Sequence, residues 1–337
     1  MHLEINKSLK NFNTFGIDCL AKQYISVTDV SELKTILADP ICSNPFVLGG
    51  GSNMLLTKDI ETLVIHLNLK GIQILSEDED SVVVEAMAGE NWHEFVLYCI
   101  EHDYGGLENL SLIPGNVGTS PIQNIGAYGV ELKDSFVSCK AVEISSQNEV
   151  EFNKAECDFG YRNSIFKQQA KGKFIVTSVV FRLSKKNHIK SISYGAIKDQ
   201  LSEKNIENPS IKDISEAVIA IRKSKLPDPK ELGNSGSFFK NPVVNTETFH
   251  AFRSKYPAAP FYELSPTSFK IPAGWLIEQA GFKGKRYGDA GIHKNQALVL
   301  VNYGNASGQE IWDLAIHIQE KVKELFGIYI EPEVNVI

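Results

Sequence analysis

IPGNVGTSPIQNIGAYG, residues 113–129, combines four glycines and two prolines with several neutral amide and hydroxyl side chains. Pro114 and Pro121 exclude a regular helix or a central strand across this run. A surface loop of ordinary composition would carry more Lys and Glu, and a core element would carry more Val and Leu. Small residues and accessible backbone N–H groups let a chain wrap closely around a large polar ligand. The run therefore predicts a loop that binds a ligand with phosphate groups.

A second glycine loop, GGGSN at residues 49–53, directly follows the short predicted strand Phe46–Leu48. Taken alone, such a pentapeptide is more often a tight turn than a binding site. Its backbone N–H groups can also converge on a diphosphate, and two glycine loops can grip one extended dinucleotide from both sides. No long amphipathic helix follows GGGSN, so the context required for a Rossmann dinucleotide fingerprint is missing.

The composition sets limits on the class of protein. A chain of 337 residues is long enough for two or three domains, and its net charge of −7 without a basic run argues against a nucleic-acid partner. Five cysteines without CxxC spacing fit reduced thiols better than disulfides or a zinc site. The N-terminal sequence lacks the apolar core of a signal peptide, and no apolar run is long enough to span a membrane. We expect a cytoplasmic protein without membrane insertion.

Hydrophobic periodicity predicts a mixture of helices and strands. Two antiparallel pairs are expected, one joining Ser135–Ile144 to Glu149–Phe152 and the other joining Phe174–Leu183 to Ile189–Ser193. The predicted helices before the last third are Val30–Ala38, Trp92–Glu101 and a segment over residues 196–224.

The clearest helix is the last one. Ser307 and Glu310 form a capping-box pattern at its start, and Gly327 follows its end. Its inward stripe is predicted to consist of Ile311, Leu314, Ile318, Val322 and Leu325.

A third polar segment, GNSGSFFKNP at residues 233–242, carries two serines on either side of Gly236. A serine between glycine and phenylalanine is sterically open on one side and dry on the other. The chain has no GxSxG elbow and its eight histidines do not cluster, which argues against a serine-hydrolase triad and against a metal site. A serine that donates a proton fits this segment better.

Eight motifs in one order along the chain closely resemble the UDP-N-acetylenolpyruvoylglucosamine reductase (MurB) family of peptidoglycan synthesis. Each motif is weak alone, but eight in order are specific, and the resemblance runs from about residue 13 to residue 334. The motifs are GGGSN, the 113–129 run, YRNS, KLPDP, GNSGSFFKNP, AGWLIEQAGFKG, HKNQALVLVN and EPEV.

This resemblance implies an α+β fold in which noncovalent FAD binds a two-subdomain unit of the vanillyl-alcohol-oxidase (PCMH) type. A C-terminal α/β substrate-binding domain would follow. The implied boundaries are residues 1–70 and 71–185 for the two FAD-binding subdomains and 186–327 for the substrate-binding domain. Residues 328–337 would return towards the site, and a monomer is expected.

The implied reaction is the reduction of UDP-N-acetylglucosamine enolpyruvate to UDP-N-acetylmuramate, with NADPH as the co-substrate that reduces the flavin first. Hydride would pass from flavin N5 to C3 of the enolpyruvyl group, and Ser237 would donate a proton to C2. Arg162 would stabilise the charge that develops on the substrate carboxylate. Glu333 matches the family's catalytic glutamate. Ping-pong kinetics are expected.

The resemblance also assigns ligand contacts residue by residue. The implied cofactor-binding residues are Gly49, Gly50, Gly51, Ser52, Asn53, Pro114, Gly115, Gly118, Thr119, Ser120, Gln123, Asn124, Gly126, Ala127 and Tyr128. The implied substrate-binding residues are Tyr194, Lys225, Asn241 and Gln296, with Tyr194 matching a mobile-loop tyrosine of the type I branch. The chain departs from many members at Asn335, where they carry arginine.

Two other interpretations remain open. Another FAD enzyme of the same binding fold, such as an oxidase or dehydrogenase of a small alcohol, would give Ser237 no role and would not bind UDP. A non-catalytic nucleotide-binding module would be colourless. The ordered set of YRNS, GSFF and EPEV favours the reductase over both, although no motif separates NADPH from NADH.

Overall fold

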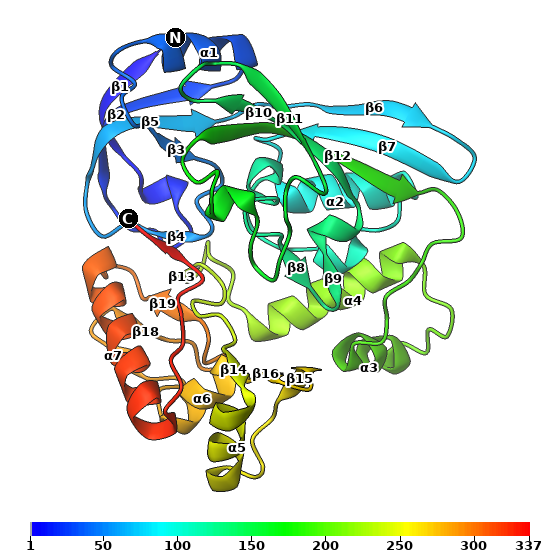
Figure 1. Ribbon diagram of the computed structural model, residues 1–337, viewed down its shortest axis with the longest axis vertical. Helices are drawn as coiled ribbons and strands as arrows, with labels where there is room; N and C mark the ends of the chain where they lie inside the picture. The colour runs from blue at the N-terminus through cyan, green and yellow to red at the C-terminus, as the bar shows by residue number, and fades with distance from the viewer. Residues whose placement is uncertain (1) are drawn as a thin grey trace. The chain divides into compact units, whose positions relative to one another are not determined.

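The computed structural model describes residues 2–337, whose contacts divide the chain into two compact units, each built from three stretches of sequence (Figure 1). Unit 1 comprises the N-terminal residues up to Lys7, Ala21–Gly50 and Ile60–Ser224. Unit 2 comprises Ser8–Leu20, Gly51–Asp59 and Lys225–Ile337. The finer boundaries near residues 70, 185 and 327 remain a prediction.

Unit 1 contains two main sheets. One has the order β1-β2-β5-β3, in which β2 and β3 both run parallel to β5. Its strands are β1 Leu3–Ser8, β2 Leu20–Val27, β3 Phe46–Leu48 and β5 Ile60–Leu67. The other is antiparallel with the order β11-β10-β12-β7-β6. Its strands are β6 Ile72–Glu77, β7 Ser81–Met87, β10 Phe136–Glu143, β11 Glu149–Asn153 and β12 Phe174–Ser184.

The described part of unit 1 also has four α-helices: α1 Val30–Ala38, α2 Trp92–Glu101, α3 Gly195–Glu203 and α4 Ile211–Lys225, which ends on the first residue of unit 2. Asn91 caps α2, and the buried Phe95 of this helix meets Phe181 of β12 with ring centroids 5.0 Å apart. The helix therefore covers one face of the antiparallel sheet (Figure 1). A smaller apolar cluster joins α3 to α4 and includes Tyr128 at its margin.

The structure confirms the first predicted antiparallel pair and shows that the second is wrong. β10 and β11 form the expected hairpin, with Cys139 opposite Phe152. β12 instead lies between β10 and β7, so neither of its edges is open to residues 189–193. The amide of Asn109 holds that segment through the Ser191 carbonyl. The helix predicted over 196–224 is also interrupted, because Asn205 takes a left-handed φ of 56° between α3 and α4.

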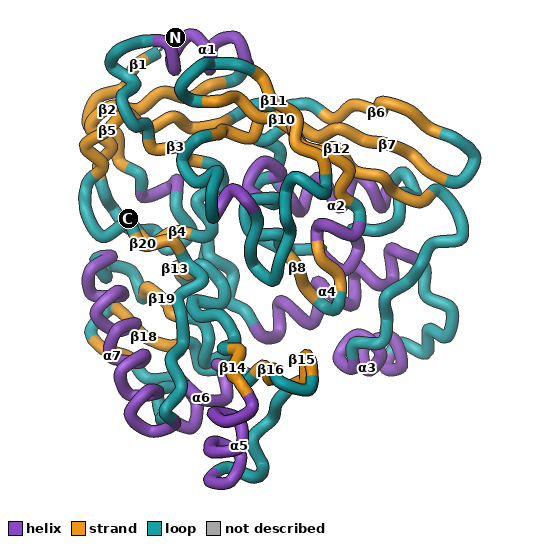
Figure 2. The backbone as a smooth tube through the Cα atoms, in the orientation of Figure 1, coloured by secondary structure: helices purple, strands orange, loops and turns teal. Residues whose placement is uncertain are grey.

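Unit 2 consists of short strands, three α-helices and a short 3-10 helix, Lys10–Phe12 (Figure 2). Its sheets have the orders β13-β19-β18-β17, β14-β16-β15 and β20-β4. The strands are β4 Met54–Leu55, β13 Gly233–Asn234, β14 Val243–Asn245, β15 Tyr262–Ser265, β16 Ser268–Lys270, β17 Arg286–Tyr287, β18 Ala290–Ile292, β19 Leu300–Asn302 and β20 Asn335–Val336. The helices are α5 Thr246–Lys255, α6 Ala273–Gln279 and α7 Gly308–Phe326.

Among these elements, the β20-β4 pair joins the most distant parts of the sequence. Asn335 pairs with Met54 in parallel, and the Ile337 N–H donates to the Leu55 carbonyl at 3.0 Å. The strand that follows GGGSN therefore has its pairing partner about 280 residues later in the sequence.

The final helix has the predicted capping box at Ser307 and Glu310, and Gly327 ends it with φ 69°. Four of the five predicted stripe residues are buried, but Leu325 is 38% exposed because the helix's last turn leaves the core.

We expect Ser307→Ala to lower the free energy of unfolding by about 1 kcal/mol, because an N-terminal N–H loses its acceptor. Urea denaturation measures this change. Ser254→Ala, which removes an exposed hydroxyl from α5, is the control with an expected change near zero.

Residues 2–337 include no helix that is both long and apolar enough to cross a bilayer. All five cysteines are buried and none is disulfide-bonded. In the same described part of the chain, no three His, Cys, Asp or Glu side chains are grouped as metal ligands.

Candidate active site

In unit 1 the two glycine-rich loops are in direct contact. A Cβ atom built on Gly49 would lie 2.7 Å from Cγ2 of Thr119. A Cβ atom on Gly50 would lie 2.7 Å from Oδ1 of Asn116 and 2.9 Å from the Gly115 Cα. Only glycine allows β3 to end against the run at this distance. The predicted pairing of GGGSN with residues 113–129 is therefore present for the part of GGGSN that lies in unit 1.

The run and its neighbours hold an unusual concentration of left-handed backbone. Positive φ angles occur at Leu112 (58°), Asn124 (44°), Tyr128 (50°) and Arg162 (53°), all residues with a Cβ atom. Such conformations cost energy, persist only where the surroundings enforce them, and cluster at binding sites. This backbone strain is typical of a binding site and supports that interpretation of the 112–128 segment and the YRNS loop.

Three of the predicted cofactor-binding residues have internal roles. Gly118 packs against Ala88, since a Cβ atom there would come within 2.4 Å of the Ala88 Cβ. Ser120 is 1% exposed and donates to the Val117 carbonyl. Asn124 is fully buried, with its amide nitrogen bonded to Glu131 and to the Gly160 carbonyl and its oxygen accepting from Lys133 N–H. These residues support the shape of the run rather than presenting side chains to a ligand.

The YRNS loop is attached to the same run. Arg162 donates from Nη2 to the Gly126 carbonyl at 2.7 Å, and Ser164 donates from Oγ to the Ile122 carbonyl at 2.7 Å. The Arg162 guanidinium also lies 5.4 Å from the ring centroid of Tyr161. The predicted catalytic arginine therefore lies beside the predicted cofactor loop, and the hydrogen bond to the Gly126 carbonyl fixes the position of its guanidinium.

Tyr194 also reaches this region. Its ring meets that of Tyr128 edge-on, with centroids 5.3 Å apart, and its side chain is 45% exposed. Burial raises the pKa of Tyr128, and the positive charge of Arg222 opposes this shift. The predicted loop tyrosine thus contacts the run while keeping an accessible face.

The sequence analysis missed two residues here, Arg222 and His93. The half-buried Arg222 of α4 donates from Nε to the Leu112 carbonyl at 3.2 Å. His93 of α2 accepts the Leu112 N–H at Nδ1, 3.0 Å away. Burial, followed by the Arg222 charge, lowers the pKa of His93. Neither residue belongs to a glycine-rich motif, so no local pattern could have identified them.

Unit 2 brings together the other two predicted catalytic residues along the backbone. The Glu333 N–H donates to the Phe238 carbonyl at 2.8 Å, and Phe239 forms a bridge with Pro332. Ser237 precedes Phe238 and is half-buried. Ser235 is buried, with its hydroxyl beside Thr14 and the Met54 carbonyl. Of the two serines in the segment, Ser237 is therefore the better candidate for contact with a substrate.

The part of GGGSN in unit 2 is bound to the EPEV segment. The Asn53 amide donates to the Glu333 carbonyl at 3.4 Å, and the Asn335 amide donates to the Asn53 carbonyl at 2.9 Å. Asn335, the residue that departs from the family pattern, therefore supports the backbone at this position. Gly51 approaches the chain closely as well, since a Cβ atom there would meet the Phe12 carbonyl oxygen at 1.9 Å.

The predicted substrate-binding residues of unit 2 lie on connected turns. Asn241 accepts the Ala273 N–H at the start of α6, at 2.9 Å. A Cβ atom on the next residue, Gly274, would lie 3.2 Å from Oε1 of Gln296. The turn of Gln296 continues to Leu298, whose carbonyl accepts the Phe238 N–H. Asn241 and Gln296 are thus joined to the segment of Ser237, whereas Lys225 lies at the end of α4.

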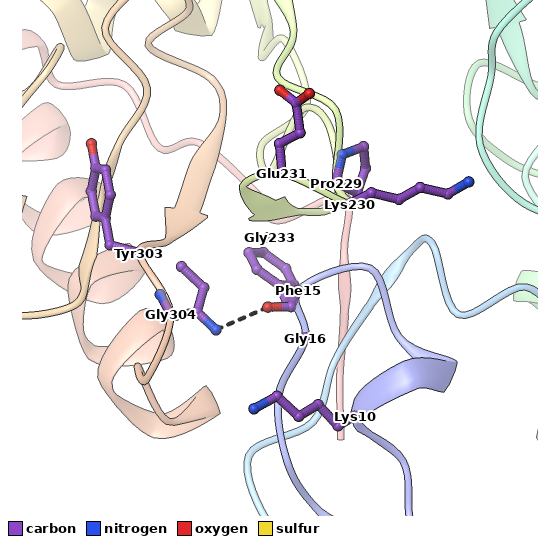
Figure 3. A pocket seen from close by; sticks show the side chains of 10 residues that line it. Lys10, Phe15, Gly16, Pro229, Lys230, Glu231, Gly233, Tyr303 and Gly304 are labelled. Carbon is purple, nitrogen blue, oxygen red and sulfur yellow. Dashed lines mark hydrogen bonds between the residues drawn. The ribbon is translucent and has the colours of Figure 1, made fainter.

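Unit 2 also contains a pocket of about 190 Å³ that none of the predicted site residues lines (Figure 3). Its walls include Lys10, Gly233 and Tyr303, and the Asn302 amide donates to the Phe15 carbonyl at 2.9 Å. This pocket is separate from the candidate catalytic residues.

Comparison with known proteins identifies the family. A family model described as the C-terminal domain of UDP-N-acetylenolpyruvoylglucosamine reductase matches residues 228–337, and one described as an FAD binding domain matches residues 21–148. A UDP-N-acetylenolpyruvoylglucosamine reductase from Flavobacterium johnsoniae is 62% identical over 337 residues, covering all of both chains. The chain belongs to this family.

Further relatives of the UDP-N-acetylenolpyruvoylglucosamine reductase family agree with this assignment. A protein of that name from Chromobacterium violaceum is 49% identical over 96% of both chains. The crystal structure of the MurB protein from Thermus caldophilus is similar in fold, with a TM-score of 0.66 over 99% of this chain and 98% of that chain at 24% identity. The predicted α+β fold with an FAD-binding unit and a family-specific C-terminal domain is confirmed.

Gly50→Ala should weaken FAD binding and lower the free energy of unfolding by about 1–3 kcal/mol, because the new methyl group overlaps Gly115 backbone. The visible absorbance of bound flavin and the thermal midpoint measure the two effects. Gly195→Ala is the matched control, since its Cβ atom would meet nothing within 4 Å. Equal flavin content in both variants would contradict close packing of the two loops.

Proposed function

We propose that this protein reduces UDP-N-acetylglucosamine enolpyruvate to UDP-N-acetylmuramate with NADPH, using noncovalent FAD, in cytoplasmic peptidoglycan synthesis. Two relatives that bear the name of this reductase match the chain over 100% and 96% of their own length. The observation that carries the proposal is the backbone bond between GSFF and EPEV, in which the Glu333 N–H meets the Phe238 carbonyl. Two motifs almost a hundred residues apart are thereby held together with Ser237 and Glu333 on adjoining positions.

The residues of unit 1 suit FAD. A flavin dinucleotide needs backbone N–H donors and cations for its diphosphate and a neutral polar surface for its ring. Gly50 lies against the backbone of Gly115 and Gly49 lies against Thr119, and Arg162 and Arg222 supply positive charge nearby. We assign the cofactor to the backbone of the two loops, with Gly118, Ser120 and Asn124 as their support. When bound, FAD would supply hydride-transfer chemistry.

The substrate carries an enolpyruvyl carboxylate, a diphosphate and a uridine. Arg162 is proposed to bind the carboxylate, because a planar guanidinium matches two carboxylate oxygens and stabilises charge that develops there. Ser237 is proposed to hold the proton destined for C2, and Glu333 to act on the same end of the substrate. Tyr194, Lys225, Asn241 and Gln296 are proposed to hold the nucleotide and sugar.

An anaerobic stopped-flow experiment on the purified protein tests the proposal. NADPH should bleach the flavin absorbance, and UDP-N-acetylglucosamine enolpyruvate should then restore it. Mixing with NADH instead of NADPH measures the nucleotide preference. A flavin that NADPH bleaches but that this substrate does not reoxidise would contradict the proposed reaction. A small alcohol that reduces the flavin directly would indicate the oxidase or dehydrogenase alternative, and a protein without flavin would indicate a nucleotide-binding module.

A further inference from the structure

Leu112, directly before the 113–129 run, has a left-handed backbone with φ 58°. For a residue with a Cβ atom this conformation is sterically unfavourable. Asparagine or glycine would adopt it more easily, so contacts elsewhere must enforce it at a leucine. The direction in which the chain enters Pro114 and Gly115 depends on this one peptide geometry.

Two side chains from different helices hold Leu112 on both of its polar backbone groups. Its N–H donates to Nδ1 of His93 at 3.0 Å, and its carbonyl accepts from Nε of Arg222 at 3.2 Å. Because Nδ1 is the acceptor, the neutral His93 ring carries its proton on Nε2. Leu112 is therefore held between side chains of two different helices, α2 and α4.

Arg222 also acts on a residue within the run. Its positive charge interacts electrostatically with the phenol of Tyr128, which also has a left-handed φ, of 50°. No ion pair joins Arg222 to a carboxylate among residues 2–337. The guanidinium from α4 therefore hydrogen-bonds the residue directly before the run. Its position suits a residue that sets how the chain enters the loop.

We propose that His93 and Arg222 form a clamp on the Leu112 peptide that presets the 113–129 run for FAD. Both are positioning residues, since they act through Leu112. The inference rests on the proposed function to the extent that FAD is the ligand of the run. It goes beyond that function by assigning the loop's geometry to two residues outside every glycine-rich motif.

Three substitutions of Arg222 separate a clamp from a simple charge effect. Arg222→Gln keeps a nitrogen donor bonded to Cδ, where arginine has Nε, but removes the charge. Arg222→Lys keeps the charge and places a methylene at that position. Arg222→Met removes both. The clamp predicts that the dissociation constant of FAD, measured by quenching of flavin fluorescence on adding apoprotein, rises about tenfold or more for Lys and Met and clearly less for Gln. A charge effect predicts the reverse order of Gln and Lys.

Matched substitutions test His93 independently. His93→Asn places an amide oxygen near the position of Nδ1 and should retain most of the FAD affinity, whereas His93→Leu should lose about tenfold. His102→Leu, in an exposed histidine directly after the same helix, is the control with unchanged affinity. In a Leu112→Gly background, where φ near 58° is easily adopted, His93→Leu should cost less than in the parent.

The outcomes are distinct. Parent-like FAD affinity in folded Arg222→Met and His93→Leu would overturn the clamp, and so would equal costs of His93→Leu in the parent and in the Leu112→Gly background. If a single variant fails to fold, the double variant that combines it with Leu112→Gly decides. Failure of the parent itself to bind FAD would instead contradict the proposed function.

Discussion

Replacing Ser237 with alanine is expected to leave flavin reduction by NADPH unchanged and to slow substrate-dependent reoxidation by about 10²–10⁴-fold. The hydroxyl is proposed to deliver a proton to carbon, and alanine has none to give. The turn that carries it should survive, because its geometry depends on Gly236, with φ 69°, and on Asn234, whose amide bonds the Pro227 and Leu232 carbonyls. Single-turnover stopped-flow measures both half-reactions separately.

Ser235→Ala is the control for this experiment. The Ser235 hydroxyl lies beside Thr14 and the Met54 carbonyl, so its loss should cost about 1 kcal/mol of stability and leave the reoxidation rate close to that of the parent. Ser237→Cys, which retains an acidic proton, should recover part of the rate lost in Ser237→Ala. Equal reoxidation rates in Ser237→Ala and the parent would remove Ser237 from the mechanism.

Arg162→Lys is expected to slow reoxidation by the substrate about 10²–10³-fold, a loss typical of removing one group that stabilises developing charge. Lysine keeps the positive charge but lacks the planar fork that binds two carboxylate oxygens. Arg162 also donates to the Gly126 carbonyl at 2.7 Å, so the substitution also releases a contact of the cofactor loop. Measuring reoxidation at saturating substrate together with the FAD dissociation constant separates these contributions.

Ser164→Ala provides the comparison for Arg162→Lys. It removes the neighbouring tie between the same two loops, the 2.7 Å bond to the Ile122 carbonyl, without removing a charge. We expect weaker FAD binding but a rate at saturation within a few fold of the parent. If both variants slow reoxidation equally once FAD is bound, Arg162 acts through loop position and not on the substrate carboxylate.

Elements with strong local signals were predictable from sequence. α1, α2 and the start of α7 follow from apolar periodicity and from caps within a few residues of each helix. The wrong predictions arose where contacts between distant parts of the chain overrode the local sequence pattern. Residues 189–193 have a strand-like pattern, but β12 already has β10 and β7 as neighbours. The break between α3 and α4 has a local signal in Asn205 and Pro209, which the periodicity of the flanking residues concealed.

The candidate site also contains residues that the sequence predicts and residues that only the structure identifies. The glycine loops are recognisable because close backbone contact, such as Gly50 against Gly115, leaves a composition that is visible in sequence. The internal roles of Ser120 and Asn124 are not recognisable, because a buried amide or hydroxyl has the same letter as one that meets a ligand. His93, Leu112 and Arg222 are far apart in the sequence, and only the fold shows that they share two hydrogen bonds.

The pairing of β20 with β4 has a consequence for how the polypeptide matures. Residues 8–20 and 51–59 are synthesised early but belong to a unit whose remaining residues begin at Lys225. During translation these two segments must wait for their later partners while the ribosome adds more than 150 further residues. Closing such long loops slows folding through their entropy. Unit 2, with Ser237 and Glu333, is therefore expected to be the late-folding part of a nascent chain whose flavin loops can form earlier.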